Sequence, residues 1–374
     1  MASHRAHLFT KPGSPLELTT LPTPTPTTGQ VLVSVLSAPI LHYSAESHAE
    51  NGALSMAPLP IVPGVGAIGR VLSVGSPTST SHEPGQLVLC DAFIRARDDP
   101  SGRTAIIQGL FPGITPAAQK LMKDEWRHSS WQEKMLVPVE NAKVLDETHL
   151  RKNLGYSLEQ LAWINHMLVP YGGLDRAELQ AGETVIVAPA TAHFSGCAVL
   201  VALAMGAGRV VALGRNVEAL ANLSNYDPSG RIMTVKLTGD AAKDNEAILA
   251  ATPGGNGAEV FIDLSPSAAK GSTHFTACFG ALKPAGRAVL VGGVLDDINI
   301  NYGLFMVKSL RLLGQFMYSS AQVAKVVALV ESGVLDLRKL KATSFEFDRL
   351  SDGIEAAKGF NRLGDLAVLT LNQE

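Results

Sequence analysis

The residues with the clearest capacity for chemistry lie between two apolar segments in the middle of the chain. The segment 189–196 reads PATAHFSG, and it joins the β-branched run at 185–187 to an apolar, helix-forming stretch at 197–205. A turn that leads from a buried strand into a helix presents backbone N–H groups and the positive end of the helix dipole. The chemistry predicted at this turn is binding of a phosphate or diphosphate group.

The elements that position this turn form half of a dinucleotide-binding unit. Glycines at 206 and 208 end the helix, and the segment 209–213 provides a second buried strand. The turn departs from the usual G-x-G-x-x-G pattern, because Pro189, Ala192 and Ser195 stand at its small-residue positions. An alanine adds one methyl group where the pyrophosphate approaches, whereas a proline removes an N–H group and fixes φ.

The end of the second strand indicates which dinucleotide would bind. Enzymes that prefer NAD carry an acidic residue about 20 positions beyond the glycine loop, whereas NADP enzymes offer a basic group to the 2′-phosphate. This chain has Gly214-Arg215-Asn216 there, with no carboxylate. The guanidinium of Arg215 can form charge-assisted hydrogen bonds with a phosphate, so NADP(H) is the expected cofactor. The alternative is an arginine that is simply exposed at a strand end.

Composition indicates an ordinary globular protein of two domains. The chain has 374 residues, a formal net charge of −3 and 46% hydrophobic residues. This balance does not indicate a nucleic-acid partner. The N-terminal residues lack the apolar core of a signal peptide, and the most apolar stretch, 198–213, is too interrupted to span a bilayer. We therefore expect no membrane association and a cytoplasmic location.

The cysteines indicate neither a disulfide framework nor a structural metal site. The chain has Cys90, Cys197 and Cys278, far apart and without paired spacing. Three cysteines exclude a four-cysteine zinc site. We expect each of them to be a small buried apolar residue.

Periodicity divides the chain into an expected β-rich domain and an expected α/β domain. Residues 1–154 carry strand patterns such as 30–36, and the stretch 91–135 is predicted to be an irregular surface excursion. Residues 155–305 alternate strand and helix, which predicts a doubly wound parallel sheet of Rossmann type. Residues 306–374 are expected to complete the first domain. The expected α/β elements are strands at 184–188, 209–213, 232–237, 259–264 and 287–291, and helices at 241–251 and 268–282.

The order of several segments resembles that of the medium-chain dehydrogenase/reductase superfamily. The matching segments are PGVGAIGRVLSVG at 63–75, GETVIV at 182–187, GAGRVVALGRN at 206–216 and KPAGR at 283–287. The resemblance covers almost the full chain. It implies a GroES-like front domain, to which the C-terminal segment returns, and a cleft between the domains that holds substrate and nicotinamide.

The same resemblance implies the branch of the family that works without zinc. The zinc-dependent branch has a cysteine after the second strand and a His-Glu pair in the glycine turn, where this chain has Leu41 and Val65-Gly66. These side chains offer no lone pair to a metal. The chain is similar to quinone oxidoreductases and enoyl reductases, including those of fungal secondary metabolism. It departs even from these, because Ala38 and Leu41 replace the polar residues of an Asn-Pro-x-Asp pattern around Pro39.

Site residues carried over from the resemblance fall into two groups. Catalytic candidates are Tyr43 and Tyr171 as hydrogen-bond donors and His42 as a proton donor. Their alternatives are a rim aromatic for Tyr43, a cap on a turn at 172–173 for Tyr171, and a structural hydrogen bond for His42. For His193, a phosphate contact and exposure to solvent are both open, and a simple strand-end turn is open for 292–293. The expected cofactor contacts are Thr191, Ala192, His193, Phe194 and Ser195 at the pyrophosphate, Gly214, Arg215 and Asn216 at the 2′-phosphate, Gly292, Gly293 and Val294 at the nicotinamide ribose, and Phe316 beside the nicotinamide.

Two functions from different classes follow. In the first, the protein transfers a hydride from NADPH to an activated C=C or C=O group of a small substrate. Added NADPH should then raise the thermal stability of the protein. In the second, the protein no longer catalyses a redox reaction and acts as a cyclase, isomerase or lyase on a bound small molecule. A non-catalytic binding protein is a third, less supported possibility. A homodimer is expected through an exposed sheet edge at 295–301.

Overall fold

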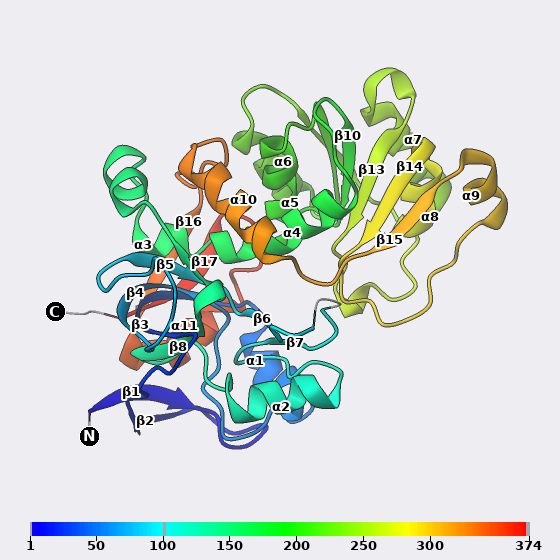
Figure 1. Ribbon diagram of the computed structural model, residues 1–374. Coiled ribbons are helices and arrows are strands. Elements are labelled where there is room, and N and C mark those ends of the chain that lie inside the picture. The colour runs from blue at the N-terminus through cyan, green and yellow to red at the C-terminus, as the bar shows by residue number, and fades with distance from the viewer. Residues whose placement is uncertain (1, 100–101, 372–374) are drawn as a thin grey trace. The chain divides into compact units, whose positions relative to one another are not determined.

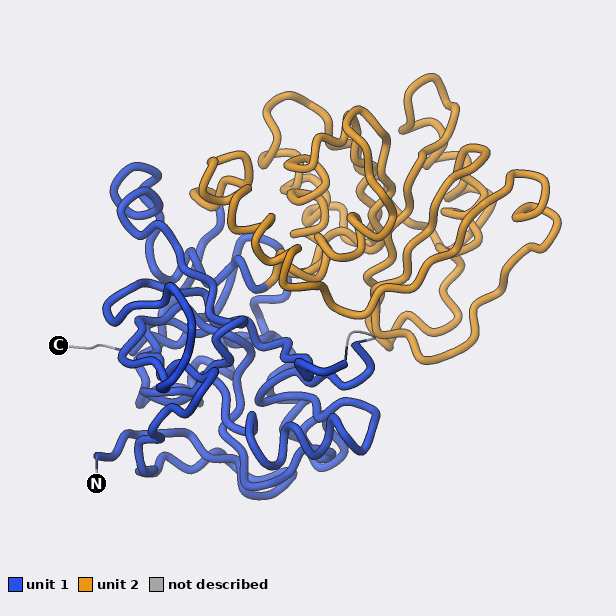
Figure 2. Tube along the Cα trace, in the orientation of Figure 1, with its two compact units in different colours: residues 1–165, 340–374 blue, residues 166–339 orange. Residues whose placement is uncertain are grey.

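The computed structural model describes residues 2–99 and 102–371, and it divides into two compact units (Figures 1 and 2). Unit 1 comprises residues 1–165 and 340–374, and unit 2 comprises residues 166–339. These boundaries differ from the expected ones at 154/155 and 305/306. The physical reason is that the segment 306–339 adds a strand and a helix to the second unit instead of returning to the first.

Unit 1 is mainly β-structure. Its strands are β1 (Ser3–Leu8), β2 (Glu17–Pro22), β3 (Gln30–Ile40), β4 (Ala67–Val74), β5 (Leu87–Cys90), β6 (Phe93–Arg95), β7 (Ala105–Ile107), β8 (Lys134–Pro138), β9 (Ala142–Val144), β16 (Lys341–Glu346) and β17 (Asp365–Thr370). Its helices are α1 (Ser44–His48), α2 (Pro116–Asp124), α3 (Leu158–Leu161) and α11 (Leu350–Ala357).

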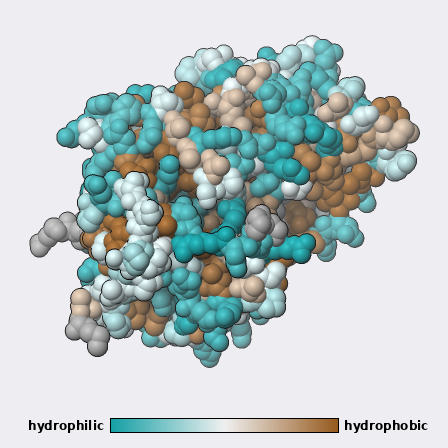
Figure 3. Space-filling model, viewed as in Figure 1, coloured by the Kyte–Doolittle hydropathy of each residue, from teal (hydrophilic) through white to brown (hydrophobic). Residues whose placement is uncertain are grey.

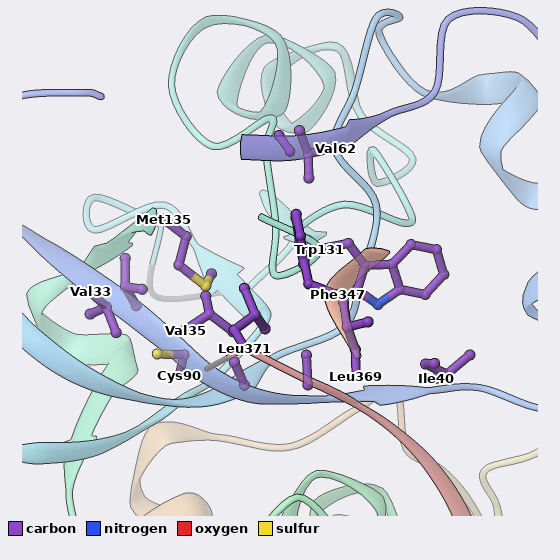
Figure 4. Close-up of a cluster of buried hydrophobic side chains, with 14 of the residues drawn as sticks. Val33, Val35, Ile40, Val62, Cys90, Trp131, Met135, Phe347, Leu369 and Leu371 are labelled. Atoms are coloured by element: carbon purple, nitrogen blue, oxygen red, sulfur yellow. The ribbon is translucent and has the colours of Figure 1, made fainter. Parts of the chain in front are cut away.

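A seven-stranded sheet forms the centre of unit 1. The strand order is β16-β17-β3-β4-β5-β9, and β8 also pairs with β3. The long strand β3 is almost entirely buried, because β17, β4 and β8 all pair along it. Side chains of β3, β5, β8 and β17 pack with Trp131 and Phe347 into one apolar cluster (Figure 4). Pairing of β17 with β3 shows that the C-terminal residues complete this unit.

The segment 91–135 is more ordered than the sequence predicts. It contains the β6–β7 hairpin and α2, and residues 100–101 within it lie outside the described residues. Its apolar residues face a second small core, so the expected irregular excursion is wrong. The buried members of this core are Phe9, Leu54, Ala57, Ile61, Ile94, Ile106, Ala118, Met122 and Trp126.

Unit 2 has the alternating pattern that the sequence predicts. Its strands are β10 (Thr184–Ala188), β11 (Arg209–Gly214), β12 (Ile232–Lys236), β13 (Ala258–Asp263), β14 (Leu282–Leu290) and β15 (Arg311–Gly314). Its helices are α4 (Ile164–Arg176, which begins at the unit boundary), α5 (His193–Ala204), α6 (Val217–Leu223), α7 (Ala241–Ala251), α8 (His274–Gly280), α9 (Tyr302–Lys308) and α10 (Ser320–Glu331).

All six strands of unit 2 are parallel, in the order β12-β11-β10-β13-β14-β15. The chain starts at β10, builds outward to β12, and then returns to the other side of β10 with β13. This is the doubly wound Rossmann order, with its topological switch point between β10 and β13. The predicted fold class is therefore confirmed.

Two elements of unit 2 differ from those that the sequence predicts. The helix expected at 268–282 is the short α8, because Gly271 has a φ of +70° that interrupts a helix before it. Residues 295–301 form a loop rather than a strand, so the expected sheet edge is wrong. The edge strand is β15, which pairs with β14 on one side.

Apolar residues of the chain pack into the cores of both units. Cys90, Cys197 and Cys278 are buried, as the sequence predicts, and burial raises the pKa of each thiol. Within residues 2–99 and 102–371, no helix combines the length and the apolar character that a bilayer crossing requires.

Candidate cofactor site

The turn before α5 is fixed by backbone hydrogen bonds to both neighbouring strands. The Ala190 N–H donates to the carbonyl of Leu213 in β11 at 2.7 Å. On the other side, the N–H of Leu264, just after β13, donates to the carbonyl of Ala188 at 3.0 Å. The turn therefore starts at the switch point, where open parallel sheets bind their ligands.

Helix α5 begins without a glycine, and Ser195 supplies the missing support. The Ala192 N–H donates to Ser195 Oγ at 3.1 Å, and Ser195 is 2% exposed. The Gly196 N–H donates to the carbonyl of Ala192 at 2.6 Å to close the first turn. Because its hydroxyl is used inside the helix start, Ser195 could offer a phosphate only its backbone N–H group.

His193 is fully buried, which excludes the solvent-exposed alternative. Its ring meets the ring of His166 in α4 edge to face, with centroids 5.4 Å apart. The His166 ring also lies against Phe194, with centroids 4.7 Å apart. The side chains of His193 and Phe194 thus help α5 pack against α4, and a phosphate contact by His193 stays a prediction.

The end of β11 brings the predicted 2′-phosphate residues next to the turn. A side chain at Gly214 would come within 3.1 Å of Thr191 Cγ2, so the two segments are in contact. Arg215 is exposed, and no ion pair of its side chain is found among the described residues. Asn216 caps α6, because its Oδ1 accepts the Ala219 N–H at 2.9 Å. Arg215 is consequently the side chain of this trio that is available to an anion.

The turn 292–294 follows β14 and is bound to the end of β13. The Gly293 N–H donates to the carbonyl of Ser265 at 2.8 Å. A side chain at Gly292 would come within 2.4 Å of the same oxygen, so only glycine fits there. Both glycines are exposed on their other side. The turn is structurally required, and it also presents backbone to a ligand at the carboxyl edge of the sheet.

Two further candidates of unit 2 lie in different surroundings. Phe316 is 61% exposed, just beyond β15. Tyr171 is 5% exposed within α4, and burial raises its pKa. The turn expected at 172–173 is wrong, because Gly172 and Gly173 both lie within the helix α4. A side chain at Gly172 would meet the carbonyl of Met317, and one at Gly173 would meet the side chain of Val291. These glycines let α4 pack closely against its neighbours.

His42 and Tyr43 lie together in unit 1, between β3 and α1. Their rings meet edge to face with centroids 5.0 Å apart. Desolvation raises the pKa of Tyr43 to about 12, so its hydroxyl keeps its proton near neutral pH. Desolvation lowers the pKa of His42, and the charge of Glu46 opposes that shift. The pair offers a neutral donor and a neutral imidazole.

The positions at which the resemblance would place zinc ligands do not fit a metal in this chain. Leu41 is 5% exposed and apolar. Gly66 has a φ of +68°, and a side chain there would come within 2.3 Å of Asn165 Oδ1 and 2.7 Å of the Cys90 carbonyl. Among the described residues, no group of three or more His, Cys, Asp or Glu side chains is placed to hold a metal ion.

Two family descriptions match successive parts of this chain. "Alcohol dehydrogenase GroES-like domain" matches residues 27–146, within unit 1, and "Zinc-binding dehydrogenase" matches residues 195–332, within unit 2. The chain belongs to the medium-chain dehydrogenase/reductase superfamily. Both matched descriptions are those of alcohol-dehydrogenase-like domains, although the zinc-ligand positions of this chain hold Leu41, Val65 and Gly66.

This medium-chain dehydrogenase/reductase has relatives in sequence and in structure. "Probable D-xylulose reductase A" of Arthroderma otae is 28% identical over 191 residues, which are 50% of this chain and 52% of that protein. The chain thus matches about half the length of this curated relative. An alcohol dehydrogenase of Thermotoga maritima superposes with a TM-score of 0.78 at 16% identity, over 100% of both chains. A Sinorhizobium meliloti 1021 protein described as a zinc-binding dehydrogenase bound to NADP superposes with a TM-score of 0.75 at 17% identity, over 99% of this chain and 100% of that one.

Within unit 2, the predicted contacts fall along one edge of the sheet. Gly214 ends β11, and Thr191 and the turn 292–294 follow the carboxyl ends of β10 and β14. Sequence patterns did not reveal a buried polar cluster at the same edge, built on Asp263 and His274. The available signal was an acidic residue directly after the apolar run 260–262, followed by a serine two positions later.

Proposed function

We propose that this protein is a zinc-independent oxidoreductase that uses NADPH to reduce an activated C=C or C=O group of a small substrate. The observation that carries the proposal is the exposed Arg215 at the end of β11, beside the turn before α5 and without a carboxylate at 214–216. In a Rossmann unit this is where the ribose 2′-substituent lies. An unpaired guanidinium favours a phosphate over a hydroxyl there.

The residues present fit the diphosphate of a dinucleotide in part. The turn begins at the switch point and leads into the N-terminus of α5, where backbone N–H groups and the positive end of a helix dipole favour an anion. Ala192 and Ser195 leave less room than glycines would. The reduced nicotinamide, when bound, supplies the hydride. The chain itself must bind the cofactor, hold the substrate and provide a proton.

Hydrogen-bond donors of the chain would stabilise the negative charge that develops on the substrate. Tyr43 is the first candidate, because its high pKa keeps it a neutral donor and its side chain is half-buried rather than enclosed. His42 beside it was the predicted proton donor, but burial lowers its pKa and leaves a neutral imidazole, which can relay a proton between its two ring nitrogens instead of acting as a charged acid. Tyr171 is more enclosed and remains the second donor candidate. A metal is not part of this proposal, because Leu41 and Gly66 supply no ligand atoms.

Transfer of deuterium from 4-deuterated NADPH to the product tests the proposal. The protein is incubated with a panel of small enones, quinones and ketones, and products are analysed by mass spectrometry. Deuterated product from a zinc-free preparation supports the proposal. Stoichiometric zinc in the active protein overturns the zinc-independent part, and turnover of a substrate without deuterium gain favours a cyclase, isomerase or lyase.

We also propose that two copies of the chain associate through the edge of the unit 2 sheet. Beside the edge strand β15, apolar side chains gather over α9 (Figure 3). Tyr302 is 81% exposed, Met306 60% and Val307 76%. An unpaired strand edge next to exposed apolar residues favours pairing with an identical strand.

We propose a cytoplasmic location as well, because NADPH is available there.

A further inference from the structure

A buried acid stands at the carboxyl end of β13, and the proposed chemistry does not yet use it. Asp263 is the last residue of β13 and is 2% exposed. Its Oδ1 accepts a hydrogen bond from Ser265 Oγ at 2.6 Å and lies 3.1 Å from His274 Nε2. On the far side of the imidazole, Ser272 Oγ lies 2.7 Å from Nδ1. These four side chains form the Asp263 network.

One arrangement of protons satisfies the whole network. With a proton on Nε2, the ring of His274 donates to Asp263 Oδ1 and also lies 3.2 Å from Ser265 Oγ, while the hydroxyl of Ser272 donates to Nδ1. The hydroxyl of Ser265 is then free to donate to the same carboxylate oxygen, as the distances allow. A buried carboxylate needs such donors, because an ionised acid removed from water is costly without them. The network is therefore an ordered structure and not a loose polar cluster.

Backbone hydrogen bonds connect the Asp263 network to both turns of the candidate cofactor site. Leu264, next to Asp263, donates to the carbonyl of Ala188 at the start of the turn before α5. The Val291 N–H donates to the carbonyl of Asp263 at 3.0 Å, and the Gly293 N–H donates to that of Ser265 at 2.8 Å. The network thus sits at the switch point of the sheet and holds the turn 292–294.

The second carboxylate oxygen faces this turn. A side chain at Gly292 would come within 2.9 Å of Asp263 Oδ2. The side-chain hydrogen bonds of Asp263 described above go to Oδ1, so Oδ2 is directed at the glycine backbone. Moving or neutralising the carboxylate would therefore disturb the turn 292–294 before it disturbs the end of β11, where Arg215 lies.

We propose that Asp263, held by Ser265 and His274, is a positioning residue that fixes the turn 292–294 for the nicotinamide ribose of the cofactor. The inference rests on the proposed NADPH binding. It assigns Asp263 to the nicotinamide half of the dinucleotide and Arg215 to the adenosine half. The two halves can consequently be tested separately.

Binding of two ligands to Asp263→Asn, measured by titration calorimetry, tests this assignment. NADPH carries both halves, whereas adenosine 2′,5′-bisphosphate carries the adenosine and the 2′-phosphate without nicotinamide. We expect the variant to bind NADPH about tenfold more weakly, because small misplacements of a binding group are costly. Its affinity for the bisphosphate should stay that of the unmodified protein.

Asp227→Asn is the matched control. Asp227 is 7% exposed and accepts hydrogen bonds from Ser229 Oγ at 2.7 Å and from the Arg231 N–H at 2.8 Å, but it precedes β12 at the opposite edge of the sheet. It should lower stability without changing the ratio of the two affinities. If Asp263→Asn does not fold, Ser272→Ala removes the outer member of the network at an exposed position and should change the ratio in the same direction.

The outcomes separate this inference from the proposed function. If Asp263→Asn leaves the ratio of the NADPH and bisphosphate affinities unchanged, whether both affinities stay the same or both fall equally, the positioning role is overturned while NADPH binding stays in place. Failure of the unmodified protein to bind either ligand overturns the proposed function, and the inference falls with it.

Discussion

Thr191 lies against Gly214, so closely that a Cβ on the glycine would be 3.1 Å from the threonine methyl carbon. This contact joins the turn before α5 to the end of β11. It places the exposed Arg215 next to the backbone that is expected to bind the pyrophosphate. The proposed preference for a 2′-phosphate therefore depends on one guanidinium, that of Arg215.

Arg215→Ala should weaken NADPH binding by about tenfold or more, because a charge-assisted pair with a phosphate is lost. NADH affinity should change little, since NADH has a hydroxyl at that position. Fluorescence titration with both cofactors measures the ratio. Arg176→Ala, another exposed arginine of unit 2, is the control that should leave both affinities intact. Equal losses for NADPH and NADH would remove Arg215 from the 2′-phosphate site.

Ser195→Ala should lower the free energy of unfolding by about 1 kcal/mol, because the Ala192 N–H loses its acceptor at the start of α5. Chemical denaturation measures the difference. Ser332→Ala, an exposed serine at the end of α10 whose hydroxyl donates to the Leu329 carbonyl, should cost clearly less. Equal costs for the two variants would mean that Ser195 does not support the helix start.

Gly66→Ala tests why a zinc ligand does not fit in the glycine turn. The left-handed φ costs about 1–2 kcal/mol for any side chain, and contact with Asn165 and Cys90 adds to it. We expect a loss of more than about 3 kcal/mol in the free energy of unfolding. Gly155→Ala has a φ of +76° and nothing within 4 Å, so it isolates the backbone cost. If the two variants are equally stable, the space at Gly66 is not restricted.

The sequence predicted the elements of unit 2 well because each is strongly patterned. The run 185–187 and the segment 209–213 are buried strands as expected, since both faces of a parallel sheet are covered. The segment 91–135 was misjudged because its apolar residues pair with distant ones, such as Phe9 and Ile61, which no local pattern reveals. The sheet edge expected at 295–301 was wrong for a similar reason. The true edge strand, β15, is short, and its pairing with the distant strand β14 is not visible in a local pattern.

The candidate site was predictable only where backbone geometry defines it. The turn at 189–196 and the strand end at 214–216 follow directly from the order of strands and helices. The roles of individual side chains did not follow. Burial of His193 depends on the neighbouring helix α4, and capping by Asn216 competes with a ligand role. The Asp263 network joins residues 263–274 through contacts that spacing alone does not indicate.

Stability should fall as the pH drops from about 6.5 to about 4. Burial, aided by the charges of Arg127 and His4, lowers the pKa of His128 from 6.5 to about 4. Its Nδ1 accepts the Val62 N–H at 3.0 Å, a contact that needs an unprotonated nitrogen. Between these pH values the unfolded chain binds the proton and the folded chain does not, so acid favours unfolding.

His128→Asn keeps a hydrogen-bond acceptor for Val62 and cannot titrate in this range. It should reduce the slope of unfolding free energy against pH by at most about 1.4 kcal/mol per pH unit, the share of one proton. Denaturant unfolding at several pH values provides the slope. His48, whose pKa burial also lowers to about 4, should account for part of the remaining slope. An unchanged slope would show that His128 takes up its proton equally in both states.

Val307→Asp should dissociate the proposed dimer, because it puts a charge into the apolar surface of α9 beside β15. Light scattering after size exclusion measures the mass. Val334→Asp is the control: Val334 is 59% exposed and lies beyond α10, away from that surface. A monomer already in the unmodified protein, or dimers in both variants, would contradict an interface at this edge.

Calorimetric titration of the unmodified protein with NADPH tests the central claim most directly. We predict saturable binding of one NADPH per chain, with a micromolar Kd, to a turn that has Pro189, Ala192 and Ser195 in place of glycines. The absence of binding at millimolar NADPH would contradict it.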